Sequence, residues 1–229
     1  MTFAEKIISF NQSLRFDHPL PDGIRVMNPY AENPQALEAS TLFYRKYYND
    51  DHSRRLILGI NPGRFGAGVT GIPFTDTKRL KEKCGIEISN VSTHELSSVF
   101  VYEFIEAFGG ATVFYRDYFI SAVCPLGFLK TGTNGKEINM NYYDEPGLMN
   151  ASRDFILTSL EKQLDFGIEQ EVCFCFGKNK NYKYLSELNR EKKYFGRIVP
   201  LEHPRFIMQY RLRLKDFYIK KYLDCMKTG

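Results

Sequence analysis

A glycine-rich segment that begins with an asparagine, within residues 56–74, holds the residue types best suited to chemistry on a flat ligand. Its first five residues, LILGI, are typical of a buried parallel strand, and Pro62 cannot continue a central strand. Four glycines follow before Phe74, so the backbone can close on a flat ligand at the carboxyl end of the strand. Asn61 stands at the strand tip, and Phe74 lies far enough along to fold back over it. An amide is not a base, so Asn61 can only orient a reactant such as water.

The elements that must position these residues alternate between strands and helices. We predict one α/β domain over 1–229, a three-layer sandwich with a four-stranded, mostly parallel sheet flanked by helices. Residues 1–50 are expected to form N-terminal helices that pack on an α/β core at 56–225. The predicted strands are 56–60, 118–127, 171–177 and 196–201, and the predicted helices are 3–15, 33–48, 148–164, the segment through 192, and 205–225.

Three further local patterns add detail to this predicted order of elements. Ser92 and Glu95 have the spacing of a capping box, for a helix that ends at Gly109. The polar segment 130–147 is predicted to be a loop. In the last predicted helix, four large apolar side chains follow one stripe at helical spacing; they are Phe206, Tyr210, Leu214 and Phe217.

Every predicted strand ends in residues that can contact a ligand. In a parallel sheet the ligand lies outside the carboxyl ends of the strands, so these ends should meet at one edge. They contribute one asparagine, one histidine, a Pro-Gly bend and several basic residues. The four strand ends are Asn61-Pro-Gly, Cys124-Pro-Leu-Gly, Gly177-Lys-Asn-Lys and Glu202-His-Pro-Arg.

Composition narrows the class of protein. The chain has 229 residues, 43% of them hydrophobic, which indicates a globular protein, and its net charge of +4 permits an anionic partner without requiring one. No apolar run reaches membrane-spanning length, and the first residues do not resemble a secretory signal. The five cysteines include no C-x-x-C pair, so we expect reduced structural thiols and neither a metal site nor an iron–sulfur cluster. These features predict an intracellular, cytoplasmic protein without cofactors that does not bind membranes.

The motifs resemble those of the single-strand-selective monofunctional uracil-DNA glycosylases, within the uracil-DNA glycosylase superfamily. GINPGRFGAGVTGIPF looks like the first motif of that family, Cys124-Pro-Leu resembles its C-P-L strand end, and His203-Pro-Arg is similar to its H-P-S-P-R motif. The motifs occur in family order. The resemblance implies the predicted fold, a monomer, and a DNA substrate that contains uracil or a related damaged base.

The resemblance also implies a role for each matching residue. Asn61 matches the catalytic asparagine that holds the attacking water, and His203 matches the histidine that faces the uracil carbonyl. Phe74 matches the ring that stacks on the extruded base, and Gly63 the glycine that leaves space beside C5. Three groups follow by position: Phe65 and Ala67 border the base, Asn139 or Asn141 reads its edge, and Arg64, Lys178, Lys180 and Arg205 contact DNA.

These residue types suit hydrolysis of an N-glycosidic bond. A base must first leave the stack, and an amide can then pair with both O4 and N3–H of uracil. Cleavage leaves negative charge on uracil O2, where a donor from His203 would act like an oxyanion hole. Because Asn61 is not a base, the bond should break before water captures the sugar cation. With no lysine at the motif positions to form a Schiff base, we expect no strand cleavage.

The sequence departs from the family at two places. H-P-S-P-R has become His203-Pro-Arg, a shorter loop in which Arg205 could still fill the gap left by the base. The segment after the second strand, NMNYYDEPGL, also differs, so base specificity can differ too. Two other classes of function stay open: a binding module that holds a modified base or nucleotide without cleaving it, and an unrelated α/β enzyme that acts on a phosphate ester.

Overall fold

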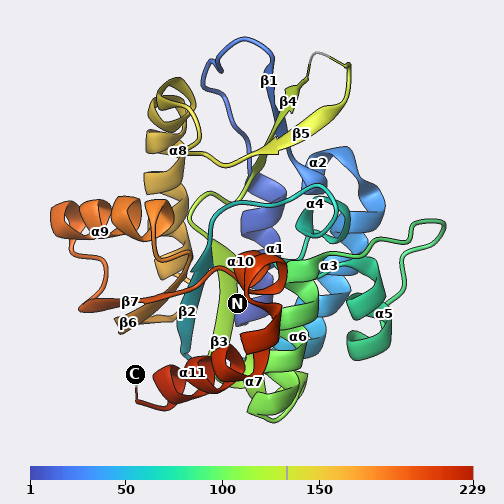
Figure 1. Cartoon of the computed structure of the whole chain (residues 1–229), viewed down its shortest axis with the longest axis vertical. Coiled ribbons are helices and arrows are strands. Elements are labelled where there is room, and N and C mark those ends of the chain that lie inside the picture. Colours follow the sequence, from blue (N-terminus) through green and yellow to red (C-terminus); the bar gives the residue numbers. More distant parts are fainter. Residues whose placement is uncertain (133, 229) are drawn as a thin grey trace.

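A parallel four-stranded sheet forms the centre of the computed structural model, which describes residues 1–132 and 134–228 (Figure 1). Its strands follow the order β3-β2-β6-β7, and all three pairings are parallel. The residues of β2 at Leu56, Ile57 and Leu58 are completely buried, as expected for a strand covered on both faces. The four predicted strands are therefore confirmed, except that the one predicted over 118–127 ends at Ala122 and residue 127 begins a strand of another sheet. Their bounds are β2 Arg54–Gly59, β3 Tyr118–Ala122, β6 Ile168–Phe176 and β7 Arg197–Leu201.

Helices cover both faces of this sheet, which confirms the predicted three-layer arrangement. In Figure 1, α8 and α9 lie on one side of the sheet, and α6, α7, α10 and α11 on the other. The longer helices are α1 Phe3–Ser13, α3 Pro34–Tyr47, α6 Leu96–Phe108, α7 Ala111–Asp117, α8 Pro146–Leu164, α9 Lys180–Lys192, α10 Pro204–Tyr210 and α11 Lys215–Thr228. Shorter ones are α2 Pro29–Glu32, α4 Ala67–Thr70, α5 Thr77–Cys84 and the 3-10 turn η1 Leu212–Leu214.

A second, antiparallel sheet was not predicted. It has the order β1-β4-β5, with β1 Ile24–Met27, β4 Gly127–Thr131 and β5 Glu137–Met140. The prediction of a loop over 130–147 was therefore wrong in part, because the chain returns as the edge strand β5. Among the residues of β5 only Met140 is buried, so the strand lacks the apolar alternation that would reveal it.

Two helix predictions also need correction. Glu95 is the N-cap residue of α6, but its side chain makes no capping bond, so the capping box with Ser92 is wrong, while the end at Gly109 is right. The last helix does not run unbroken over 205–225: it stops at Arg211 and resumes as α11 after the short turn η1. Its apolar stripe is exposed rather than buried, with exposed fractions between 39% at Phe206 and 61% at Phe217.

Candidate active site

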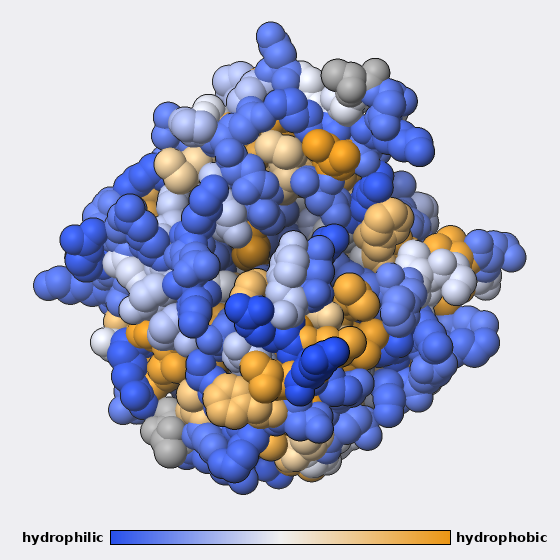
Figure 2. Space-filling model, in the orientation of Figure 1, coloured by the Kyte–Doolittle hydropathy of each residue, from blue (hydrophilic) through white to orange (hydrophobic). Residues whose placement is uncertain are grey.

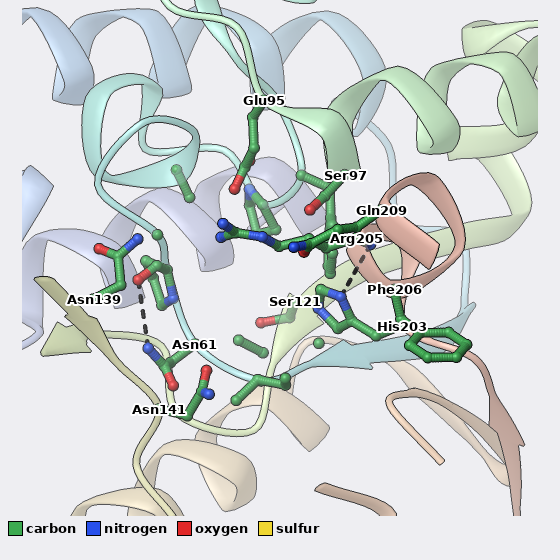
Figure 3. A pocket seen from close by; sticks show the side chains of 18 of the residues that line it. Asn61, Glu95, Ser97, Ser121, Asn139, Asn141, His203, Arg205, Phe206 and Gln209 are labelled. Carbon is green, nitrogen blue, oxygen red and sulfur yellow. Dashed lines mark hydrogen bonds between the residues drawn. The ribbon is translucent and has the colours of Figure 1, made fainter. Parts of the chain in front are cut away.

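A cavity of about 450 Å³ lies at the carboxyl ends of the sheet strands, where the sequence predicted a site (Figure 3). Most of the predicted site residues line it: Asn61, Gly63, Ala67, Phe74, Asn139, Asn141, His203 and Arg205. Several lining residues were not predicted from the sequence: among them are Glu95, Ser97, Ser121, Phe206, Gln209 and Tyr210. The site therefore combines β2 and its glycine-rich loop with β5, the start of α6, and α10.

Backbone groups hold the amide of Asn61 in one orientation. Its Nδ2 donates to the carbonyl of Met140 at 3.1 Å, and its Oδ1 accepts from the backbone N–H of Tyr142 at 3.1 Å. Tyr142 is itself fixed, because its buried hydroxyl donates to Asn181 at 2.7 Å. One lone pair of Oδ1 stays available to accept from a water molecule in the cavity.

His203 is neutral, and its hydrogen bonding fixes the tautomer. The backbone N–H of Arg205 donates to Nδ1 at 3.2 Å, so Nδ1 carries no proton. Burial lowers the pKa of the imidazole to about 4, and the positive charge of Arg205 adds to this effect. A neutral imidazole has one N–H, so Nε2 must carry it. The cavity that Asn61 lines therefore also has a neutral hydrogen-bond donor, on the ring that Figure 3 shows bordering the pocket.

Phe74 forms an aromatic wall of the cavity and is held there by close packing. A methyl group on Gly59 would come within 2.7 Å of its ring, so the ring lies directly against the backbone of β2. The ring also packs edge-on against Phe176, with centroids 5.3 Å apart. The backbone of Phe74 has a φ of 54°, a strained value for an aromatic residue that persists only where packing enforces it.

The glycine-rich loop and β5 are joined through Asn139. The backbone N–H of Arg64 donates to Asn139 Oδ1 at 3.2 Å, and the Arg64 guanidinium donates to the carbonyl of Glu137. The Nδ2 atom of Asn139 faces Gly63, 3.6 Å from where a side chain on that glycine would begin. Asn141 also borders the cavity, but its amide donates to Asp144. Of the two candidates for reading a base edge, Asn139 has the better-placed donor.

Glu95 brings a carboxylic acid to the cavity that no sequence motif indicated. A methyl group on Gly66 would lie 2.1 Å from its Oε2, and one on Gly63 would lie 3.3 Å from its Oε1, so the carboxyl packs on the glycine-rich loop. Burial raises the pKa of Glu95 to about 7; Arg205 lowers it and Asp76 raises it. Figure 3 shows Glu95 and Arg205 on the same side of the pocket, away from Asn61. This group changes charge near neutral pH.

Four predicted site residues are not among those that line the cavity. Phe65 points outward, with 53% of its surface exposed, because the loop turns its side chain away from the pocket. Lys178 pairs with Glu202 at 2.9 Å. Lys180 lies 5.7 Å from the ring centre of Tyr143, and Arg64 is bound to β5 as described above. Contact of these residues with a base or with phosphate remains a prediction.

The described part of the chain shows no group of three or more residues that could hold a metal ion. It also contains no helix long and apolar enough to cross a membrane. Burial raises the pKa of Cys124 and of Cys175 to about 12. These thiols are too protonated at neutral pH to act as nucleophiles or ligands.

Comparison with known proteins agrees with the resemblance seen in the motifs. A family model of the uracil DNA glycosylase superfamily matches residues 45–227. The chain is 29% identical over 150 residues to the single-strand selective monofunctional uracil-DNA glycosylase of Rattus norvegicus; the match covers 56% of this chain and 50% of that protein. The chain therefore spans about half the length of this curated relative. The crystal structure of wild-type SMUG2 from Pedobacter heparinus is 54% identical, with a TM-score of 0.98, over 100% of this chain and 98% of that one.

Proposed function

Because the chain belongs to the uracil DNA glycosylase superfamily, we propose that it hydrolyses the N-glycosidic bond of uracil, or of a 5-substituted uracil, in DNA. The observation that carries this proposal is the pairing of a backbone-held Asn61 with a neutral His203 in one cavity. The product is a DNA strand with an abasic site and a free base.

Recognition begins with a base that has left the stack. Its ring lies against Phe74, and Asn139 hydrogen bonds to its Watson–Crick edge. Space beside Gly63 receives the C5 position, where a side chain would meet Glu95 at 3.3 Å. The amide of Asn139 suits uracil because its Nδ2 can donate to O4, while Oδ1, which accepts from the N–H of Arg64, keeps a second lone pair for N3–H.

Bond cleavage is assisted by His203. As the N-glycosidic bond breaks, negative charge develops on uracil O2, and the Nε2–H of His203 donates to that oxygen. A neutral donor is sufficient, since the charge that it stabilises is a developing one. Asn61 then holds the water that captures the sugar cation, with its Oδ1 as the acceptor. Among the described residues that line the cavity there is no lysine, so no Schiff base forms and the strand is not cut.

A direct test uses an end-labelled oligonucleotide with a single uracil, both single-stranded and in a duplex. The expected result is a shorter product only after alkali treatment, and its loss in Asn61→Ala. Full activity of Asn61→Ala would refute the mechanism. Binding of the uracil strand without any product would instead support the alternative, a module that holds a modified base or nucleotide.

A further inference from the structure

An exposed aromatic surface borders the mouth of the cavity. Phe206 and Tyr210 on α10 line the cavity, yet they expose 39% and 60% of their surface. We call these two side chains the aromatic rim. On the face shown in Figure 2, hydrophobic and strongly hydrophilic residues lie side by side around the middle of the molecule.

Arginines lie over two exposed phenylalanines, Phe206 of the rim and Phe65 of the glycine-rich loop. The guanidinium of Arg64 is 4.5 Å from the ring centre of Phe65, and that of Arg211 is 5.5 Å from the ring centre of Phe206. The rings of Phe206 and Tyr210 are 5.6 Å apart and inclined by 44°, so they do not stack face to face and leave ring surface free. Arg211 also donates to the carbonyl of Tyr210 at 3.0 Å, which keeps its charge beside the rim.

This combination fits a strand with unpaired bases. Every base has a flat face that stacks on an aromatic ring, whatever its sequence, and arginine attracts the phosphates between the bases. Within a duplex these base faces are already stacked on one another and are not available. The rim is continuous with the cavity that receives a base, so the nucleotides next to that base in the chain are the nearest candidates to reach it.

We propose that α10 is a stacking platform on which Phe206 and Tyr210 bind the bases that neighbour the extruded nucleotide, so that the platform favours single-stranded over duplex DNA. This inference rests on the proposed function for its ligand. The rest of the exposed stripe is not part of the platform: Phe217, on α11, is 61% exposed but does not line the cavity.

The test measures binding of a fluorescent single-stranded oligonucleotide that carries one 2′-fluorinated deoxyuridine, whose glycosidic bond resists cleavage. Tyr210→Ala should weaken single-strand affinity by about 5- to 150-fold, the range for loss of one stacked base. Tyr210→Phe should restore it, since the ring remains. Phe217→Ala is the matched control, equally exposed but away from the cavity, and should bind as the unmodified protein does.

Salt dependence separates stacking from charge. Tyr210→Ala should leave the slope of log affinity against log salt unchanged, whereas Arg211→Gln should reduce it by about 0.7, the value for one phosphate contact on a single strand. An unchanged single-strand affinity for Tyr210→Ala would overturn the platform, as would an equal loss of affinity for a duplex. A dimer that dissociates in Tyr210→Ala would also overturn it, because it would assign the rim to a second copy of the chain.

The outcomes also distinguish this inference from the proposed function. If the protein excises uracil but Tyr210→Ala binds normally, the platform is wrong and the glycosylase stands. If binding requires Tyr210 but no uracil is released, the platform stands and the chemistry is wrong.

Discussion

The neutrality of His203 leads to a prediction that can be worked out in numbers. With a pKa of about 4, about 1% of His203 is protonated at pH 6, whereas an ordinary histidine with a pKa of about 6.5 would be about three-quarters protonated. Because the pKa differs by about 2.5, protonation of the ring costs roughly 3 kcal/mol more in the folded protein than in the unfolded chain. As pH falls, the unfolded chain binds this proton before the folded protein does. The free energy of unfolding therefore decreases between about pH 6.5 and about pH 4.

Nuclear magnetic resonance of the imidazole nitrogens measures this directly. We expect His203 to stay neutral at pH 6, with Nε2 protonated and Nδ1 unprotonated, because Nδ1 accepts from Arg205. In single-turnover assays, His203→Ala should slow uracil release by about 100- to 1000-fold, the usual effect of removing one oxyanion donor. His52→Ala is the control, since that side chain is 63% exposed and does not line the cavity.

Two results would refute this reasoning. If the His203 resonances titrate near pH 6.5, the ring is not desolvated as the structure indicates, and the donor would be an imidazolium ion at low pH. If the ring is neutral but Nδ1 carries the proton, the bond from Arg205 does not exist and α10 is capped in another way.

Three further predictions concern the walls of the cavity. Burial raises the pKa of Glu95 to about 7, so the folded protein keeps a proton that the unfolded chain releases above about pH 4.5, and stability falls as pH rises through this window. In urea unfolding, the free energy of unfolding of the unmodified protein should be lower at pH 8 than at pH 5, and Glu95→Gln should remove most of this difference, roughly 1–3 kcal/mol. An equal effect of the substitution at both pH values would contradict this. Gly59→Ala would place a methyl group 2.7 Å from the Phe74 ring and should lower stability by about 1–3 kcal/mol together with uracil affinity, as measured by thermal unfolding and product inhibition. In kinetic assays, Asn139→Ala should slow excision by about 5- to 150-fold, because the hydrogen bonds to the base edge are lost. Asn141→Ala should have a smaller effect, because the amide of Asn141 is bound to Asp144. The reverse order would assign recognition of the base edge to Asn141.

The parallel sheet could be predicted because its strands are buried on both faces. In the predicted strand 171–177, residues 172–176 then form an uninterrupted apolar run with turn residues after it, and both features appear in the sequence. The antiparallel sheet could not be predicted in this way. In β5 the side chains of Ile138 and Asn139 face solvent or the cavity, and only Met140 is buried, so neither apolar alternation nor an apolar run marks the strand.

The residues of the candidate site also differ in whether the local sequence marks them. Asn61, Phe74 and His203 stand at places that the local sequence marks, namely a strand end, a glycine-rich turn and a helix cap, although distant residues such as Met140 and Phe176 hold the side chains of Asn61 and Phe74. Glu95 reaches the cavity only because α6 begins there, and its spacing from Ser92 favours an interpretation as a cap. The ion pair of Lys178 with the buried Glu202 likewise joins residues far apart in the sequence, and no spacing indicated it. Contacts between distant elements leave no spacing signal in a single sequence.

The shortened His203-Pro-Arg loop unites the chemistry of the cavity with the surface beside it. Pro204 occupies the first position of α10 and has no N–H, so the first N–H that the cap residue can accept belongs to Arg205. His203 meets that N–H with Nδ1, and the bond that begins the helix therefore also directs the proton to Nε2. Phe206 and Tyr210 follow within the same seven-residue helix. The donor to the base and the aromatic rim are thus fixed relative to one another by a short rigid element, so a change in the cap should alter base release and strand binding together.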